Sequence, residues 1–424
     1  MKERIAIIDG LRSPIAKANG KLNSVSADTL GAIITKELVL RNNLPYELFD
    51  EVIMGNVAQP ANSANIARVM AIRAGFPQAT PAYTVHRNCA SGMQSISSAI
   101  EKIHSKQGDL YLVGGMESMS NIPILYSDEF RNFITKFTYA RSAGEKLKTL
   151  ASFRLGFLKP TIGLISGLTD PISGKIMGIT AENLANEFKI SRAAQDEYAL
   201  NSHLKAQKAI ENKIFKNEIH PIMTKDASIM DDDGVRFNQT IEALNKLNPI
   251  FDRLSGTVTA GNSSQVSDGA CSLIVCSESK ARELNLEPLG FINDYAYAGL
   301  DAHRMGLGPV YATKKLFDKT GVSLKDIDLI ELNEAFAAQV IANIKAFNSN
   351  EFCKKTFNSS VIGEIDESIL NVNGGAIALG HPVGMSGARI VLTALKELKR
   401  KDKKLGLATL CIGGGQGASF LLEV

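Results

Sequence analysis

Residues 91–115 and 386–414 show the same order of sequence features. Each stretch begins with Ser-Gly, continues with apolar residues at helical spacing, and ends in a polar turn, a strand and a Gly-Gly pair. A second match lies upstream, where residues 49–53 (Phe-Asp-Glu-Val-Ile) correspond to residues 327–331 (Ile-Asp-Leu-Ile-Glu). Because helices alternate with strands in both places, the repeat predicts an α/β fold built from two duplicated halves.

The segment between the halves, roughly residues 121–246, differs in composition. Two helices are predicted there, one from a Thr180 cap and one from a Ser191 cap to about Asn212. Residues 130–165 contain seven Lys or Arg against one acid, Glu145, with five phenylalanines among them. Two interpretations stay open: a solvated amphipathic cover over a pocket, or an element that contacts a membrane surface or a partner.

The overall charge excludes some classes of protein. The chain has 47 Lys and Arg against 44 Asp and Glu, a net charge of +3, which is too weak for a nucleic-acid-binding surface. Residues 368–388 and 405–422 lack charged side chains but are rich in Gly and Ser, unlike a membrane span. The apolar run near the N-terminus is too short for a signal peptide. We therefore expect a soluble, cytoplasmic protein.

The cysteine count excludes a secreted disulfide framework, because five cysteines are an odd number thinly spread in a long chain. No CxxC or HxxxH pair indicates a zinc site, so no metal is expected. Cys271 and Cys276 lie on an apolar strand and are predicted to be core residues. Cys353 lies in a polar segment and is predicted to be at the surface or an interface.

Cys89 lies at a predicted turn from a strand to a helix. A helix N-terminus presents free N–H groups and a positive dipole end, which predicts a lowered thiol pKa. The alternative is a buried, inert thiol. The small residues Ala-Ser-Gly after Cys89 would let a substrate approach, which favours a nucleophile.

Two further residues lie in charge-free, glycine-rich loops. His381, in Gly-His-Pro before a helix, is either structural or the partner that activates a thiol nucleophile. Cys411 precedes Gly413-Gly414-Gly415, where no Lys-Ser/Thr follows and no GxGxxG is present, so a nucleotide loop is not indicated. A second thiol can act as a general acid or base, because its ordinary pKa is about 8.5.

Asn333 follows a predicted strand in the sequence Asn-Glu-Ala-Phe. Its amide could orient a water molecule or donate to an oxyanion, and it could equally cap the following helix. Residues 259–264, Thr-Ala-Gly-Asn-Ser-Ser, form a loop of small residues suited to close packing against a ligand.

Taken together, these motifs resemble the thiolase family. They are Asn-Cys-Ala-Ser-Gly-Met, Ala-Gly-Asn-Ser-Ser with Asp-Gly-Ala, Asn-Glu-Ala-Phe, Gly-His-Pro-Val-Gly-Met-Ser-Gly and Cys-Ile-Gly-Gly-Gly-Gln-Gly, in that order over the whole chain. The resemblance implies two βαβαβαββ halves in a five-layered α/β/α/β/α core with an inserted loop domain. The expected boundaries are 1–121 with 247–285 for the first half, 122–246 for the insertion and 286–424 for the second half.

The resemblance also implies a role for each matching residue. Cys89 would be the nucleophile that accepts the acyl group, His381 the base that activates it, and Cys411 the thiol that protonates the departing acetyl-CoA carbanion. Asn333 would hold the water of one oxyanion hole, shared with His381. The N–H groups of Cys89 and Gly413 would form the other.

Two more positions, Ser264 and Met177, match residues that line the pantetheine of coenzyme A. The implied activity is that of a 3-ketoacyl-CoA thiolase of fatty-acid β-oxidation, with coenzyme A as substrate and no other cofactor. Alternatives are an acetoacetyl-CoA thiolase that condenses two acetyl-CoA, a ketoacyl-carrier-protein synthase, which would lack Cys411, and a non-catalytic lipid-binding protein, which would lack both thiols.

Residues 153–160, 175–178 and 307–313, and the extra stretch near residues 352–369, resemble the β-subunit of fatty-acid oxidation trifunctional complexes. Short-chain thiolases usually carry His where this chain has Ile176, whereas the β-subunits typically carry His where it has Asn333. The resemblance implies a homodimer or homotetramer, and a complex with a hydratase/dehydrogenase α-subunit. It leaves the acyl chain length and the direction of flux open.

Overall fold

The computed structural model describes residues 3–424, apart from the side chains of residues 161, 162, 164 and 165. Ten strands form one sheet in the order β12-β13-β14-β11-β1-β10-β5-β3-β4, with β2 paired to β10. These strands are β1 (Ile5–Arg12), β2 (Ala16–Lys17), β3 (Glu51–Gly55), β4 (Ala82–Val85), β5 (Leu110–Ser118), β10 (Ser267–Ser277), β11 (Gly290–Gly299), β12 (Leu329–Leu332), β13 (Leu405–Ile412) and β14 (Gln416–Glu423).

The sheet consists of two similar halves joined where β1 pairs with β11. In each half a strand runs parallel to its neighbour (β3 to β5, β12 to β13), and that neighbour pairs antiparallel with the last strand (β10 or β14). The helices of the halves are α1 (Ala27–Arg41), α2 (Ile66–Ala74), α3 (Ser91–His104), α10 (Glu278–Glu283), α11 (Gly308–Thr320), α12 (Ala337–Phe347), α13 (Asn350–Phe357), α14 (Ala376–Leu379) and α15 (Val383–Arg400). The predicted duplicated α/β fold is thus confirmed.

The repeat extends to individual hydrogen bonds. Asp50, just before β3, accepts hydrogen bonds from the backbone N–H groups of residues 109 and 110 at 2.7 and 2.9 Å. Asp328, just before β12, accepts from those of residues 404 and 405 at 3.1 and 3.0 Å. Each carboxylate therefore fixes the start of the neighbouring parallel strand. The halves differ at β4, whose counterpart is a single bridge between Ile330 and Leu370.

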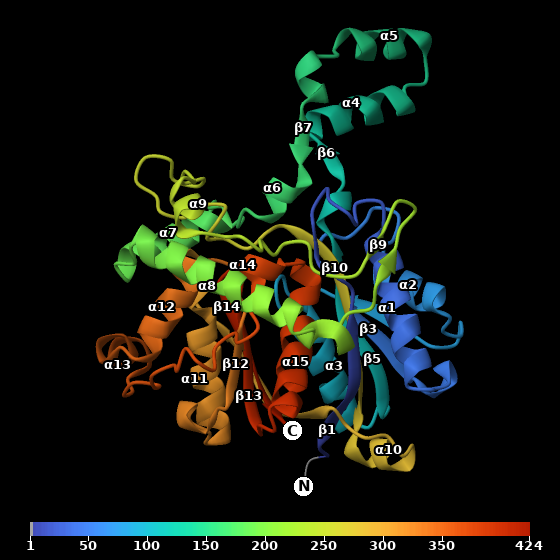
Figure 1. The fold of residues 1–424 in the computed structure, drawn as a ribbon. Helices are drawn as coiled ribbons and strands as arrows, with labels where there is room; N and C mark the ends of the chain where they lie inside the picture. Colours follow the sequence, from blue (N-terminus) through green and yellow to red (C-terminus); the bar gives the residue numbers. More distant parts are fainter. Residues whose placement is uncertain (1–2) are drawn as a thin grey trace.

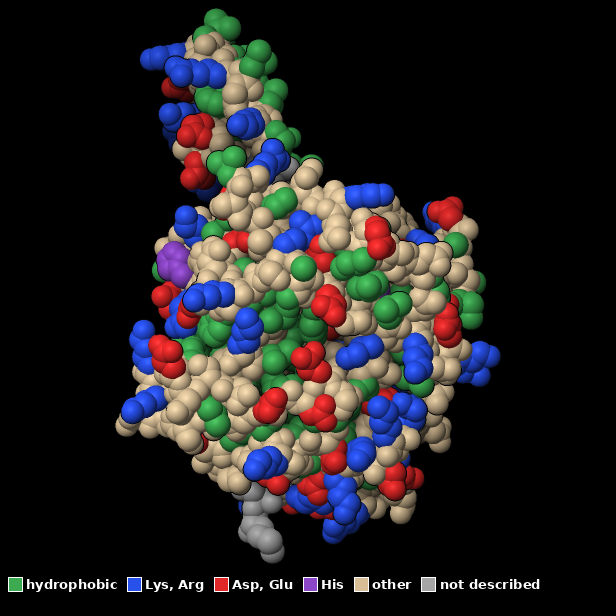
Figure 2. Space-filling view, turned by 60° about the vertical axis from the view of Figure 1, so that its left-hand side comes forward, with side chains coloured by type: hydrophobic (Ala, Val, Ile, Leu, Met, Phe, Trp, Pro, Cys, Tyr) green, Lys and Arg blue, Asp and Glu red, His purple; other side chains and the backbone are tan. Residues whose placement is uncertain are grey.

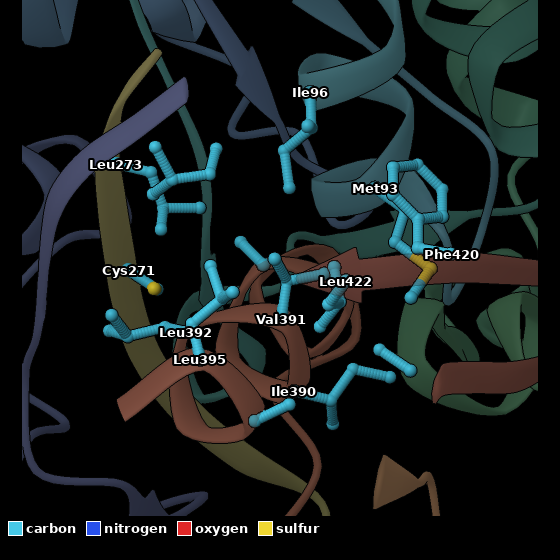
Figure 3. Close-up of a cluster of buried hydrophobic side chains, with 14 of the residues drawn as sticks. Met93, Ile96, Cys271, Leu273, Ile390, Val391, Leu392, Leu395, Phe420 and Leu422 are labelled. Carbon is cyan, nitrogen blue, oxygen red and sulfur yellow. The ribbon is translucent and has the colours of Figure 1, made fainter. Parts of the chain in front are cut away.

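The layers follow from how the helices pack (Figure 1). The helices α3 and α15 pack against each other and against strands of both halves, so they form the central layer. Figure 3 shows side chains of these helices, such as Met93 and Val391, converging with Leu273 of β10 and Phe420 of β14. The outer layers are α1 and α2 on one side and α11 and α12 on the other, each over its own apolar cluster. This is the predicted five-layered core.

The segment between β5 and β10 holds most of the remaining elements. They are β6 (Ile124–Tyr126), α4 (Asp128–Tyr139), α5 (Ala143–Ala151), β7 (Pro160–Ile162), α6 (Gly163–Gly167), α7 (Met177–Glu187), α8 (Arg192–Glu211), β8 (Ile222–Met223), β9 (Ser228–Ile229) and α9 (Ile241–Asn245). The Ser191 cap is confirmed, because its side chain accepts a hydrogen bond from the N–H of Ala194. Thr180 is not a cap; its hydroxyl donates to the carbonyl of Met177, where that helix begins.

The helices α4 and α5 form a hairpin arm, residues 124–162, on a neck made by β6 and β7 (Figure 1). The arm projects from the body, so it does not form the cover over a pocket that was one of the two interpretations. Inside it, the ring of Phe133 packs against those of Phe130, Phe137, Phe153 and Phe157. This small aromatic cluster holds the two helices together.

The three remaining cysteines are all buried. Cys271 and Cys276 lie within β10, as predicted. The surface position predicted for Cys353 is wrong, because α13 turns this residue inward, where its thiol lies 3.6 Å from the carbonyl oxygen of Ala346. No helix among the described residues is long and apolar enough to cross a bilayer, and no cluster of His, Cys, Asp or Glu in that range could hold a metal ion.

Candidate active site

The loop between β4 and α3 carries Cys89 at the N-terminal end of α3, as the sequence predicts. Asn88 takes a positive φ of 43°, which turns the chain sharply before the helix. Its side-chain amide donates to the carbonyl of Gly413 at 2.7 Å. The Cys89 loop of the first half is therefore attached directly to the glycine loop of the second half.

The thiol of Cys89 is half-buried. Burial raises its pKa, while hydrogen bonds from the N–H groups of Gly413 and of Cys89 itself lower it, and the net direction is upward. The lowered pKa predicted from the helix N-terminus is therefore wrong for the resting thiol. The ionised form is held by N–H groups but needs a base to remove its proton.

Cys411 ends β13 on the other side of the site and is buried. Burial raises the pKa of its thiol, and a charge on the nearby Cys89 raises it further. The two thiols, from separate halves, thus lie close enough to affect each other's ionisation. Cys411 carries its proton at neutral pH and can donate it.

The imidazole of His381 lies just before α15 and is only 8% exposed. Its Nδ1 lies 2.6 Å from the hydroxyl oxygen of Ser386, and its Nε2 has no hydrogen-bond partner among the residues that the structure describes. Burial, together with the positive charge of Arg389, lowers the pKa of His381 to about 4. The ring is therefore neutral at physiological pH and has a free nitrogen available as a base.

Asn333 leaves the end of β12, and its N–H donates to the carbonyl of Thr409 in β13 at 3.0 Å. The helix-cap alternative is wrong for this residue, because α12 begins at Ala337 and its N-cap residue is Phe336. Neither side-chain atom of the buried Asn333 has a hydrogen-bond partner within the described part of the chain. The amide is thus free to bind a water molecule or an oxyanion.

Residues 259–267 hold the Asn333 and His381 loops side by side. The N–H of Ser264 donates to the carbonyl of Ala335 at 2.9 Å, and the N–H of His381 donates to that of Gln265 at 3.1 Å. Ser264 therefore joins the site through its backbone. On the opposite side, a Cβ added at Gly413 would lie 3.3 Å from the sulfur of Met177, which places Met177 directly beside the glycine loop.

Three buried polar groups at or near the site were not predicted from the sequence. Ser386 contacts His381, Glu117 lies buried beneath the Cys89 and His381 loops, and Glu334 binds Tyr198 and Ser202 of α8. Glu117 leaves one sequence signal, since it is a lone charge in the apolar, glycine-containing strand β5. The partners of Glu117 and Glu334 come mainly from distant segments that folding brings together, whereas Ser386 lies only five residues after His381.

The site as a whole combines a half-buried thiol near N–H groups, a neutral buried imidazole, an unpaired amide and a second, protonated thiol. This combination fits an acyltransferase that works through a thiol nucleophile. The chain matches the family model "Thiolase, N-terminal domain" over residues 5–279 and "Thiolase, C-terminal domain" over residues 286–424. It belongs to the thiolase family and is an acyltransferase.

Known relatives agree over the full length. A 3-ketoacyl-CoA thiolase of Yersinia enterocolitica is 39% identical, over 100% of this chain and 97% of the relative. Among solved structures, Bacillus anthracis acetyl-CoA acetyltransferase matches with a TM-score of 0.87 and 36% identity over 100% of this chain and 99% of that one. Human mitochondrial 3-ketoacyl-CoA thiolase in complex with CoA matches with a TM-score of 0.85 and 36% identity over 99% and 98%.

Proposed function

We propose that this thiolase cleaves 3-ketoacyl-CoA with coenzyme A to acetyl-CoA and a shortened acyl-CoA, in fatty-acid β-oxidation. The observation that carries the proposal is the meeting of Cys89 and Cys411 from opposite halves, each at the edge of the Gly413 loop. In this proposal one thiol accepts the acyl group and the other delivers a proton. The names of the Yersinia and human relatives support 3-ketoacyl-CoA as the substrate.

The first half-reaction transfers the acyl group to Cys89. The thiol sulfur attacks C3 of the substrate while His381 takes its proton at Nε2. The C2–C3 bond then breaks, and acetyl-CoA leaves as an enolate that takes a proton at C2 from Cys411. The N–H groups of Cys89 and Gly413 stabilise one developing oxyanion, and His381 with a water held by Asn333 stabilises the other.

The second half-reaction transfers the acyl group from Cys89 to coenzyme A. The thiol of coenzyme A gives its proton to the Cys411 thiolate and attacks the acyl carbon, and the proton held on His381 returns to Cys89. Ser264 and Met177 would line the pantetheine arm, because both lie beside the loops that carry the catalytic groups. A human thiolase structure with bound CoA supports this use of coenzyme A.

Covalent labelling tests the nucleophile. Incubation with an acyl-CoA should leave an acyl group on Cys89, and the Cys89→Ala variant should remain unlabelled. Cys353→Ala is the matched control, because it removes a buried thiol of α13 that no proposed step uses, and it should label normally. Covalent labelling of Cys89→Ala would place the nucleophile elsewhere.

The second candidate is an acetoacetyl-CoA thiolase that condenses two acetyl-CoA, which the match to Bacillus anthracis acetyl-CoA acetyltransferase favours. Turnover of acetoacetyl-CoA measured against a long-chain 3-ketoacyl-CoA separates the two. We expect faster turnover of the long-chain 3-ketoacyl-CoA. Equal rates on the two substrates would contradict the assignment to fatty-acid degradation.

We further propose that the arm contacts an anionic membrane surface. The basic side chains on it are Arg131, Lys136, Arg141, Lys146, Lys148, Arg154 and Lys159. Large apolar side chains are also exposed there, with Leu155 82% and Leu147 69% accessible. Figure 2 shows basic groups, with a few acidic ones among them, along one side of the arm and apolar groups along the other. This is the amphipathic arrangement of an element that lies in a membrane interface.

A homodimer or homotetramer, and a complex with a hydratase/dehydrogenase α-subunit, are proposed from the trifunctional β-subunit resemblance alone. Gel filtration of the chain, alone and co-expressed with such a subunit, tests both. A monomeric elution volume would overturn the homo-oligomer, and separate elution would overturn the complex. Cell fractionation tests the expected cytoplasmic location together with the membrane contact.

A further inference from the structure

Glu117 is a buried carboxylate that receives hydrogen bonds only from N–H groups. One oxygen accepts from the side-chain amide of Asn56 at 3.0 Å and from the N–H of Ala58 at 2.9 Å. The other accepts from the N–H of Val57 at 3.1 Å and from that of Gly384 at 2.8 Å. The side chain is 0% exposed, and none of these four partners carries a positive charge. Burial raises the pKa of Glu117 to about 7, while the hydrogen bonds from these N–H groups oppose that effect and stabilise the ionised form.

Gly384 belongs to the first turn of α15, the helix that carries Ser386 and follows His381. The N-cap residue of this helix is Pro382, whose side chain makes no capping hydrogen bond. The first N–H groups of a helix need an acceptor, and a carboxylate there also interacts favourably with the helix dipole. Glu117 therefore caps α15 from the other half of the molecule.

The other partners of Glu117 lie beneath the Cys89 loop. The N–H of Asn56 donates to the carbonyl of Val85, the last residue of β4 before that loop. A Cβ added at the preceding Gly55 would lie 2.5 Å from the backbone carbon of Ser91, in the first turn of α3. One carboxylate thus bonds to a segment that supports α3 and to the first turn of α15.

Backbone contacts between the halves at this point are equally close. A Cβ at Gly115 would lie 1.9 Å from the carbonyl oxygen of Gly384, and a Cβ at Gly92 would lie 2.5 Å from the nitrogen of Ala388. With no side chains between them, the N-terminal ends of α3 and α15 meet backbone to backbone. A small displacement of Gly384 would therefore move the His381 loop relative to Cys89.

From this geometry we infer that Glu117 is a positioning residue, which holds the His381 loop in register with Cys89 by capping α15 across the interface between the two halves. The inference rests on the proposed thiolase reaction, in which His381 removes the proton of Cys89. A carboxylate suits the task because all four partners are donors. A Gln amide or a protonated carboxyl would turn a donor toward one of them.

The charge of Glu117 has a second effect, which opposes the first. It contributes to the raised pKa of the Cys89 thiol. Removing the charge alone would therefore make Cys89 more reactive, whereas losing the position of His381 would make it less reactive. The sign of the change in Cys89 reactivity distinguishes positioning from a purely electrostatic role.

The test compares Glu117→Gln, Glu117→Asp and the control Asp50→Asn. Asp50 also accepts two backbone N–H bonds, at the opposite end of β5, and both donors, residues 109 and 110, belong to the first half. Two readouts are taken at about pH 8.5, where Glu117, with its pKa of about 7, is ionised. They are kcat and KM for thiolysis, and the rate of Cys89 alkylation by iodoacetamide, followed by peptide mass spectrometry. Thermal midpoints show whether each variant is folded at the assay temperature.

We expect Glu117→Gln to lower kcat and the alkylation rate together, each by about tenfold to a hundredfold, with little change in KM for coenzyme A. Glu117→Asp should recover part of both losses, and Asp50→Asn should match the wild type. Unchanged or faster alkylation in a folded Glu117→Gln protein would overturn the inference. Because alkylation needs no substrate, it tests Glu117 even if the chain proves inactive as a thiolase.

Discussion

The Nδ1 atom of His381 lies 2.6 Å from the hydroxyl oxygen of Ser386. Ser386 donates its only hydroxyl proton to the carbonyl of Pro382 at 2.9 Å. The hydroxyl oxygen can then only accept from His381, so this network assigns the proton to Nδ1 and leaves the lone pair on Nε2. Ser386 thereby sets the tautomer that the proposed base needs.

Replacing Ser386 with Ala should therefore slow acyl transfer without preventing folding. With no acceptor beside Nδ1, the neutral ring can adopt the other tautomer, which has no lone pair at Nε2. We expect kcat to fall about tenfold or more, the effect of losing one hydrogen bond on catalytic orientation. Ser386→Thr keeps the hydroxyl and should retain most of the activity. Equal activity of the Ala variant and the wild type would show that Ser386 is not needed to set the tautomer of His381.

The buried His381 should also make stability depend on pH. Its folded pKa of about 4 lies below the ordinary 6.5, so the unfolded chain binds a proton between these values and the folded protein does not. Stability should fall as pH decreases from about 6.5 toward about 4, by up to about 3 kcal/mol from this residue. Urea unfolding at several pH values measures it.

The control for that measurement is His381→Asn, which removes the titrating group. Burial raises the pKa of Glu117 to about 7, so the contribution of this group to the stability of the folded protein decreases as pH rises, opposite to that of His381. The difference between wild type and His381→Asn isolates the histidine. If the free energies of unfolding of the two proteins changed with pH in parallel, the pKa of His381 would not be lowered by folding.

Asn333 should matter for catalysis more than for folding. Its buried amide has no protein hydrogen bond among the described residues, so Asn333→Ala breaks none. We expect kcat to fall by about 10²–10³, the usual cost of losing an oxyanion group. Asn371→Ala is the matched control: this buried amide bonds to Leu332 and Glu334, so its loss should mainly lower the free energy of unfolding. Full activity of Asn333→Ala would exclude the oxyanion role.

Features set by local sequence could be predicted closely. The apolar residues at helical spacing that follow Ser91 form α3 (Ser91–His104), and the pattern shared by residues 49–53 and 327–331 recurs as the paired Asp50 and Asp328 hydrogen bonds. In both cases the determinants, apolar spacing and a polar residue before a strand, lie within a few residues of each other.

Features set by contacts between distant segments could not be predicted. The pKa of Cys89 is raised because surrounding chain removes water from it, which outweighs the N–H groups visible in the local motif. Glu117 binds residues 56–58 and Gly384, which only folding brings together. Cys353 lies in a polar stretch, yet one face of its short helix packs inward.

The arm should bind anionic vesicles through its exposed apolar side chains. The double variant Leu147→Glu with Leu155→Glu replaces two of these side chains by charged ones. Each substitution removes about 2 kcal/mol of binding free energy that burial of a leucine in the membrane would contribute. We expect the wild type to sediment with phosphatidylglycerol vesicles and the double variant to remain in the supernatant, with unchanged turnover of a short soluble substrate. Because Lys and Arg contribute, high salt should weaken wild-type binding.

A matched control for the arm is Leu254→Glu, since Leu254 is 99% exposed but belongs to a loop of the body and not to the arm. If apolar exposure anywhere on the molecule caused vesicle binding, this variant would lose it too. Binding that survives in Leu254→Glu and is lost in the arm variant assigns the contact to residues 124–162. A wild type that stays in the supernatant, or an arm variant that still sediments, would contradict the membrane contact. In that case the exposed leucines would indicate a protein partner, because an apolar face with basic charge on a projecting hairpin suits a protein surface as well as a membrane.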